Sequence, residues 1–267
     1  MDLLKNCPRD TLAAVKGVLT DIDDTVSTEG TLTAEAYGAL EALKKAGLLV
    51  VPVTGRPAGW CDHIARFWPV DAVVGENGAF WMWHDRAGGR LRTRFIQSEA
   101  ERAEGRRRLE QVRAQVLQEV PGAGIASDQP YRAADLAVDF REDVPPLSDA
   151  DIQRIVAIFE RHGAHAKVSS IHVNGWFGSY DKLSMAQLML RERYGLELAQ
   201  ERERCLFVGD SPNDAPMFAY LPHAVGVANV RDLAERMSAL PAYVTPSRGG
   251  AGFAEVACAL VAARNMS

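Results

Sequence analysis

Short apolar runs alternate with helix-like segments at both ends of this chain, and the alternation stops in the middle. Before residue 80 the expected strands lie at 17–20, 48–53 and 72–74, and the expected helices at 33–45 and 60–67. After residue 182 the expected strands lie at 205–208, 224–227 and 242–244, and the expected helices at 184–194 and 252–263. Strands and helices that alternate in this way form right-handed βαβ units around a parallel sheet.

The middle of the chain has a different pattern. Its expected segments are a hairpin over 80–95, a charged helix over 98–120, a half-buried strand over 136–140, a helix over 149–161, and one or two strands over 168–177. Hairpins and helices in this order are typical of a small α+β domain with an antiparallel sheet. The sequence therefore predicts an α/β protein with a Rossmann-like parallel-sheet core of residues 1–82 and 179–267. The α+β domain, residues 83–178, is inserted into it.

Composition narrows the class of partner. The chain has 267 residues, of which 47% are hydrophobic and 24% are charged, as expected of a soluble globular protein. Its net charge of -5 argues against nucleic acid or an anionic membrane as the main partner. No apolar stretch approaches the ~20 residues of a membrane helix. We expect a monomer or a small homo-oligomer that binds a small molecule.

The cysteines indicate a reducing compartment. The four of them are far apart in the sequence and form no CxxC pair, so neither a zinc site nor a disulfide framework is expected. The first 16 residues mix charges with apolar residues and lack the continuous apolar segment of a signal peptide. We therefore expect a cytoplasmic protein.

Two carboxylates follow the first predicted strand. Asp21 and Asp23 are two residues apart, so both can point to the same side of the sheet edge. Such anions repel each other unless a cation lies between them or one of them carries a proton. Both arrangements fit phosphoryl transfer, in which one carboxylate attacks phosphorus and the other holds a proton for the leaving oxygen. The alternative is a capping cluster, because Asp and Thr are common turn residues.

Polar residues also follow two other predicted strands. Thr54 and Gly55 come after one strand, where a hydroxyl and an unhindered N–H can hold phosphate oxygens. Asp210 and Asp214 come after another and offer the oxygen ligands that Mg²⁺ takes. Each segment by itself also suits an ordinary turn. Because the carboxyl ends of parallel strands form one crevice, we expect all of them to meet there.

Lys182 lies where the chain re-enters the parallel sheet. A lone lysine is usually a solvated surface group. A site with three aspartates and a phosphate dianion, however, carries more negative charge than one Mg²⁺ balances. A unit charge pair at 4 Å is worth about 4 kcal/mol at an effective dielectric constant near 20. Lys182 is therefore the best candidate for the missing cation.

These four segments resemble the motifs of the haloacid dehalogenase-like superfamily. Residues 17–25 are similar to the first motif, 53–56 to the second, Lys182 to the third and 209–214 to the fourth, in the family's order. Leu183 departs from the family pattern, in which glycine often follows the lysine. Residues 76–79 resemble a segment of the branch whose cap domain follows the second motif, and the α+β insertion is similar to that cap. The branch contains phosphatases of sugar phosphates, sucrose phosphate and mannosyl-3-phosphoglycerate, and also phosphomannomutases.

The resemblance implies a role for each motif residue. Asp21 would be the nucleophile and a Mg²⁺ ligand. Asp23 would be the general acid and then the base, and its backbone carbonyl would bind Mg²⁺. Asp210 would complete the direct protein ligands, with Asp214 acting directly or through water. The phosphoryl oxygens would be held by Thr54, Gly55, Lys182 and Asn213.

The cap is expected to select the substrate and to exclude water. Candidate substrate contacts are Arg56, Asn77, His172, Asn174 and Trp176. A salt bridge within the protein is an equal alternative for Arg56, and packing at a domain interface is the alternative for the tryptophan.

The sequence thus predicts a Mg²⁺-dependent hydrolase of a small phosphomonoester, a sugar or sugar-acid phosphate, that acts through an aspartyl-phosphate. A phosphomutase that uses the same intermediate is one alternative. A catalytically inactive binding or regulatory relative is another.

Overall fold

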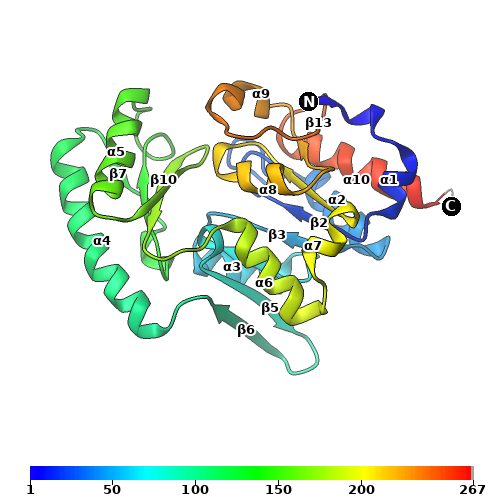
Figure 1. Ribbon diagram of the computed structural model, residues 1–267, viewed down its shortest axis with the longest axis horizontal. Helices are drawn as coiled ribbons and strands as arrows, with labels where there is room; N and C mark the ends of the chain where they lie inside the picture. Colours follow the sequence, from blue (N-terminus) through cyan, green and yellow to red (C-terminus); the bar gives the residue numbers. More distant parts are fainter. Residues whose placement is uncertain (266–267) are drawn as a thin grey trace.

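The computed structural model describes residues 1–265 and has two lobes, of which the larger holds both ends of the described chain (Figure 1). The larger lobe is built on a six-stranded sheet in which every strand pair is parallel. The strands lie in the order β1 (Asp2–Leu3), β13 (Tyr243–Val244), β12 (Val225–Gly226), β11 (Cys205–Gly209), β2 (Gly17–Thr20) and β3 (Leu49–Pro52). The predicted parallel sheet, built from both ends of the chain, is confirmed.

The register of the central strands determines where the polar motifs lie. Thr20 at the end of β2 is opposite Val208 on one side and Pro52 on the other. The residues that follow these three strands therefore lie at the same edge of the sheet. Because β2 and β11 are buried along their whole length, their apolar sequences have no polar face.

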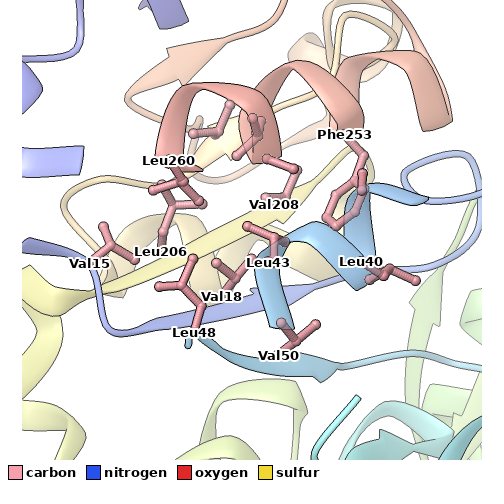
Figure 2. Packing of buried hydrophobic residues seen from close by; sticks show 14 of the residues in the cluster. Val15, Val18, Leu40, Leu43, Leu48, Val50, Leu206, Val208, Phe253 and Leu260 are labelled. Atoms are coloured by element: carbon pink, nitrogen blue, oxygen red, sulfur yellow. The ribbon is translucent and has the colours of Figure 1, made fainter. Parts of the chain in front are cut away.

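Helices cover both faces of this sheet. On one face α1 (Arg9–Ala14), α2 (Ala34–Lys45) and α10 (Gly249–Asn265) pack on β2, β3 and β11. Figure 2 shows Leu43 and Leu260 of two of these helices beside Val18 and Leu206 of the sheet. Helix α2 begins after Thr33, whose hydroxyl accepts the N–H of Ala36, and ends before Gly47 with φ of +77°. On the other face lie α6 (Lys182–Tyr194) and α8 (Ala215–Tyr220).

A three-stranded antiparallel sheet extends the larger lobe. It consists of β4 (Val73–Gly75), β5 (Phe80–Asp85) and β6 (Arg90–Phe95). A single parallel bridge between Val53 and Val74 connects it to the main sheet, and α3 (Ala58–Phe67) packs against it. The predicted domain boundary between residues 82 and 83 falls within β5, and the division into domains stays a prediction.

The smaller lobe is an antiparallel sheet covered by two helices on one face. Its strands lie in the order β7 (Gly124–Ile125), β8 (Leu136–Asp139), β10 (His172–Trp176) and β9 (His165–Val168). The covering helices are α4 (Glu99–Glu119) and α5 (Asp149–Arg161). The charged helix α4 buries only a narrow stripe that includes Leu109, Val112 and Val116. A Ser98–Glu101 capping box begins this helix.

One predicted feature of this lobe is wrong. The sequence of β8 alternates like a half-buried strand, but all four of its residues are buried. Leu136 and Val138 face α4 and α5, while Ala137 and Asp139 are covered from the opposite side. The alternation of apolar and polar residues in a strand shows which of its faces is apolar. It does not show whether another part of the chain covers the polar face.

The remaining elements are short. They are η1 (Leu4–Asn6), η2 (Glu76–Gly78), η3 (Gln129–Tyr131), α7 (Leu198–Glu201), η4 (Arg202–Arg204), η5 (Pro212–Asp214), α9 (Val230–Leu233) and η6 (Ala234–Arg236). The sequence pattern did not predict β1, α1 or β7, each of which is at most six residues long. Within residues 1–265, no helix combines the length and the apolar character that crossing a membrane requires.

Leu43→Ala tests the packing between α2 and α10. Leu43 is fully buried in the cluster shown in Figure 2, so its truncation leaves a cavity. We expect the free energy of unfolding, measured with urea, to fall by about 2–5 kcal/mol. Leu117→Ala is the control, because this leucine of α4 is 47% exposed. Its change is expected to stay within about 0.5 kcal/mol, and equal losses in both variants would contradict the described core.

Candidate functional site

Three buried carboxylates meet at the carboxyl edge of the main sheet. Asp21 follows β2, Asp210 follows β11, and Asp214 ends η5. The relative exposure of these residues is 4%, 1% and 0%, and one carboxylate oxygen from each lies within 4.8 Å of the others. The predicted meeting of the first and fourth motifs is therefore observed.

Lys182 brings a positive charge into this cluster. Its Nζ donates to Oδ1 of Asp21 and to Oδ1 of Asp214, at 2.7 Å in each case. The lysine is the first residue of α6, which is fixed by a capping box between Asp181 and Ser184. Leu183 is the second residue of this helix and packs against the core cluster, so no glycine is needed there.

The three carboxylates of the cluster carry more negative charge than the ammonium of Lys182 balances. Burial, together with the carboxylates of Asp214 and Asp23, raises the pKa of Asp21 to about 8, although Lys182 acts in the opposite direction. Burial and the neighbouring aspartates also raise the pKa of Asp210 well above its ordinary value. Burial alone would lower the pKa of Lys182, but Asp21 and Asp214 raise it. Three carboxylates and one ammonium thus fit a further cation, and the oxygen donors suit a hard one such as Mg²⁺.

Backbone and side-chain donors hold the fourth motif. Oδ2 of Asp214 accepts the N–H groups of Asp210 and Ser211, at 3.0 and 3.2 Å. Asp210 accepts Thr25 Oγ1 at 3.2 Å and Asn229 Nδ2 at 2.8 Å. A Cβ at Gly209 would lie 2.4 Å from Oδ2 of Asp214, so this turn requires glycine.

The second motif lies beside two asparagines. A Cβ at Gly55 would be 3.2 Å from Nδ2 of Asn77, and Asn77 Oδ1 accepts Asn213 Nδ2 at 3.2 Å. Nδ2 of Asn77 is buried and has no hydrogen-bond partner in the part of the chain that the structure describes. Thr54 is fully buried, and its Oγ1 accepts the N–H of Arg56 at 3.0 Å. Of these residues, Gly55 and Asn213 line the same space as Asp21.

Both lobes enclose the space above Asp21 and Asp23. This chamber has a volume of ≈10 Å³, and its lining includes Gly55, Asn174 and Asn213. A much larger cleft of ≈610 Å³ lies between the lobes and reaches Asp210. Ser169 and Ser170 line both spaces, so the turn between β9 and β10 separates the chamber from the cleft.

The candidate substrate residues of the smaller lobe have different surroundings. Nε2 of His172 is 2.9 Å from Oε2 of Glu142, and Asn174 Nδ2 donates to Asp135 Oδ2 at 3.0 Å. Both of these candidates line the chamber. Trp176 lies outside the chamber lining and stacks on Tyr180, with ring centroids 5.6 Å apart.

Glu76, which the sequence did not single out as a site residue, connects the two lobes. Its carboxylate is fully buried and accepts four backbone N–H groups at 2.7–3.2 Å, one from the larger lobe and three from the segment before β8. The donors are Ala58, Ala133, Ala134 and Asp135. A glutamate has no local sequence signal for such a role, because its donors lie far away in the chain.

Arg132 is a second connection that sequence reasoning missed. Its guanidinium donates to the backbone carbonyl of Gly55 at 3.0 Å and pairs with Asp128 and Asp135 at 2.9 and 3.0 Å. These carboxylates belong to the smaller lobe, whereas Gly55 belongs to the larger one. The turn at Thr54 and Gly55 of the core is thus in direct contact with the smaller lobe.

Comparison with known proteins finds one matching family model. Residues 18–102 match the model of the family described as haloacid dehalogenase-like hydrolase. No curated protein matches the sequence.

Solved structures share the fold along nearly the whole chain. The C-terminal domain of the trehalose-6-phosphate phosphatase of C. albicans has a TM-score of 0.73 at 12% identity, over 98% of this chain and 97% of that one. A protein of Thermoplasma acidophilum has a TM-score of 0.69 at 19% identity, over 92% and 98%. The sucrose-phosphatase of Synechocystis, in complex with sucrose and phosphate, has a TM-score of 0.63 at 14% identity, over 91% and 97%. The predicted resemblance to the haloacid dehalogenase-like superfamily is confirmed.

Glu76→Gln tests the buried connection between the lobes. Burial, followed by Asp135, raises the pKa of Glu76 from 4.5 to about 7. At pH values between 4.5 and about 7, Glu76 is protonated in the folded protein and ionised in the unfolded chain. The free energy of unfolding therefore falls as the pH rises through this range. Because the variant lacks this titration, we expect a smaller fall between about pH 5 and about pH 7 in urea unfolding.

The matched control is Glu160→Gln, because Glu160 is an exposed residue of α5. The control is expected to keep the pH slope of the wild-type protein. A Glu76→Gln protein with the same slope as the wild type would contradict the raised pKa.

Proposed function

We propose that this chain, which has the fold and the motifs of the haloacid dehalogenase-like superfamily, is a Mg²⁺-dependent phosphatase. Its substrate would be a small phosphomonoester, a sugar or sugar-acid phosphate, hydrolysed through an aspartyl-phosphate. The observation that carries the proposal is the cluster of three buried carboxylates at the sheet edge, two of which contact the ammonium of Lys182. Such an excess of negative charge is unfavourable unless a further cation belongs with it.

Asp21 is the proposed nucleophile. One of its oxygens is fixed by Lys182, and its backbone N–H donates to the carbonyl of Val208 at 2.8 Å. A carboxylate oxygen of Asp21 would attack phosphorus, and the bond between phosphorus and the ester oxygen would break. Asp23 would give its proton to the leaving oxygen, then take a proton from the water that hydrolyses the aspartyl-phosphate. The products are an alcohol and inorganic phosphate.

The metal would be held by the carboxylates of Asp21 and Asp210 and by the backbone carbonyl of Asp23. Among residues 1–265 this carbonyl accepts no backbone hydrogen bond, which leaves it free for the role. Oδ1 of Asp214 accepts from the ammonium of Lys182 and its Oδ2 accepts from two backbone N–H groups, whereas each oxygen of Asp210 accepts one hydrogen bond from a neutral side chain. Asp214 would therefore act through water. When bound, Mg²⁺ would neutralise charge on the phosphoryl group.

The polar groups beside Asp21 are suited to phosphoryl oxygens. Gly55 and Asn213 line the chamber together with Asp21. The ammonium of Lys182 contacts Asp21, and Thr54 precedes Gly55 in the chain. Thr54, Gly55, Lys182 and Asn213 are therefore the proposed donors to the phosphoryl oxygens. The unpartnered amide N–H group of Asn77 adds a further donor.

The cleft between the lobes supports a substrate larger than phosphate. Its volume of ≈610 Å³ has room for a sugar, and polar and charged side chains from both lobes line it. Two of the similar structures are named as phosphatases of sugar phosphates, those of trehalose 6-phosphate and of sucrose phosphate. A sugar or sugar-acid phosphate is therefore the proposed substrate class.

Asp21→Asn tests the mechanism. We expect the wild-type protein to release phosphate from members of a panel of sugar and sugar-acid phosphates with Mg²⁺, and to release none with EDTA. The variant cannot form the aspartyl-phosphate, so its release is expected to fall to the background rate. Its melting curve, measured in parallel, verifies that the protein assayed is folded. The ranking of kcat/KM across the panel identifies the preferred substrate.

Two outcomes would count against the proposal. Release that persists in Asp21→Asn would exclude this residue as the nucleophile. If the wild-type protein releases no phosphate from any compound, the phosphatase assignment fails. Isomerisation of a sugar phosphate activated by a sugar bisphosphate would then indicate a mutase.

Metal binding can be measured without turnover. A cation that binds only the folded protein stabilises it by about 2.7 kcal/mol at a hundredfold excess over its Kd. We expect Mg²⁺ to raise the melting temperature of the wild-type protein and to leave that of Asp210→Asn unchanged. The control is Asp232→Asn, because Asp232 is an exposed carboxylate that pairs with Arg248. An equal Mg²⁺ effect in all three proteins would exclude the proposed site.

A further inference from the structure

Arg56 is a buried cation that contacts carboxylates of both lobes. Its Nε and Nη2 lie 2.8 and 2.7 Å from Oδ1 of Asp23. Nη2 also lies 3.1 Å from Oε1 of Glu142, and Nη1 lies 3.6 Å from Oδ2 of Asp128. The guanidinium stacks on the ring of Trp60 at 4.3 Å from its centroid. All parts of the guanidinium are therefore in contact with protein groups.

The smaller lobe holds Glu142 in a rigid turn. Oδ1 of Asp139, at the end of β8, accepts the N–H groups of Arg141 and Glu142 at 2.9 and 2.7 Å, and its Oδ2 accepts that of Asp143 at 2.8 Å. Asp139 is directly opposite His172 in the register of β8 and β10. The ring of His172 lies 2.9 Å from Oε2 of Glu142.

Glu142 therefore contacts a different partner with each carboxylate oxygen. Oε1 accepts from Arg56 in the larger lobe, and Oε2 faces His172 in its own lobe. The close contact with the ring of His172 and the charge of Arg56 lower the pKa of Glu142 to about 2, although partial burial opposes this. The side chain is thus an anion whose position is determined from two sides.

Asp23 has one oxygen held and one oxygen available. Oδ1 is the atom that Arg56 contacts, whereas Oδ2 accepts no hydrogen bond from residues 1–265. The available oxygen is on a residue that lines the chamber. A general acid must lie within hydrogen-bond distance of the leaving oxygen. The contact between Arg56 and Oδ1 therefore determines whether Oδ2 can lie close enough to that oxygen.

We propose that Glu142 is a positioning residue for the reaction. It fixes Arg56, and Arg56 in turn fixes the carboxyl group of Asp23. The proton donor is then fully ordered only when the two lobes are together, because Glu142 is supplied by the smaller lobe. This inference rests on the proposed phosphatase function and on the role of Asp23 within it.

Direct substrate binding by Arg56 fits the contacts less well. The guanidinium is only 5% exposed, and it already pairs with three carboxylates. Capture of an anionic substrate group would have to displace one of them. Of the two roles that the sequence left open for Arg56, the structure shows the salt bridge within the protein.

The test compares Glu142→Gln with the wild-type protein on two substrates. One is p-nitrophenyl phosphate, whose leaving group departs as a stable anion and needs little help from an acid. The other is the best sugar phosphate of the wild-type protein, whose alkoxide leaving group needs a proton. The quantity is kcat/KM, because it reports the steps up to formation of the aspartyl-phosphate.

We expect Glu142→Gln to lose about tenfold or more of kcat/KM on the sugar phosphate, which is part of the 10²–10⁴-fold that a positioned acid contributes. On p-nitrophenyl phosphate the loss should stay below about twofold, because this leaving group gains little from an acid. Glu160→Gln is the control and is expected to match the wild-type protein on both esters. Arg56→Lys keeps the charge but lacks the planar fork, and it is expected to show the same selective loss.

Equal losses on the two esters, or no loss on either, would overturn the role of Glu142 and leave the phosphatase function intact. If Glu142→Gln unfolds, as judged from its melting curve, Arg56→Lys decides the question by the same comparison. Absence of phosphate release by the wild-type protein from both esters would overturn the proposed function, and this inference with it.

Discussion

The ion pairs of the buried ammonium of Lys182 are the interaction on which the site depends. An uncompensated buried charge is costly, so Lys182 requires Asp21 and Asp214, and each aspartate requires Lys182. The three side chains come from the start of α6, the end of β2 and the turn after β11. Their pairing therefore connects segments from both ends of the chain at one point of the sheet edge. The position of the smaller lobe follows from this point, because its last strand, β10, ends at Trp176, a short segment before Lys182.

The contact between the lobes is partly apolar and partly polar. Trp176 and Ala134 of the smaller lobe share an apolar cluster with Ile64 and Phe80 of the larger lobe. Beside this cluster the lobes meet through the ion pairs and hydrogen bonds of Glu76, Arg132, Arg56 and Glu142. Ion pairs and hydrogen bonds are directional, so they specify one relative position of the lobes more sharply than apolar contact does. Mutual positioning of this kind suits a site whose lining comes from two separate parts of the chain.

The larger lobe was predicted well because its strands and helices can be recognised from neighbouring residues in the sequence. Strands buried on both faces read as continuous apolar runs, and parallel topology then brings the residues after β2 and β11 to the same edge. The connections between the lobes could not be predicted in this way. Arg56 and Glu142 are 86 residues apart, and Glu76 and Ala133 are 57 apart. Each of these residues suits a solvated turn, and only the packing of one lobe on the other buries it. Trp176 is a similar case. It alternates along β10 with His172 and Asn174, but it packs on Tyr180 outside the chamber.

The small chamber above Asp21 would also bear on the timing of the proposed reaction. Its ≈10 Å³ is about the room that one water molecule needs, and a phosphate ion is larger than a water molecule. With the turn at Ser169 and Ser170 in this place, phosphate released there could not diffuse away. The lobes would then have to separate once in each turnover, against the ion pairs that hold them together. Under the proposed function, stronger contacts between the lobes would slow the departure of phosphate, and weaker ones would leave the reacting groups less well aligned.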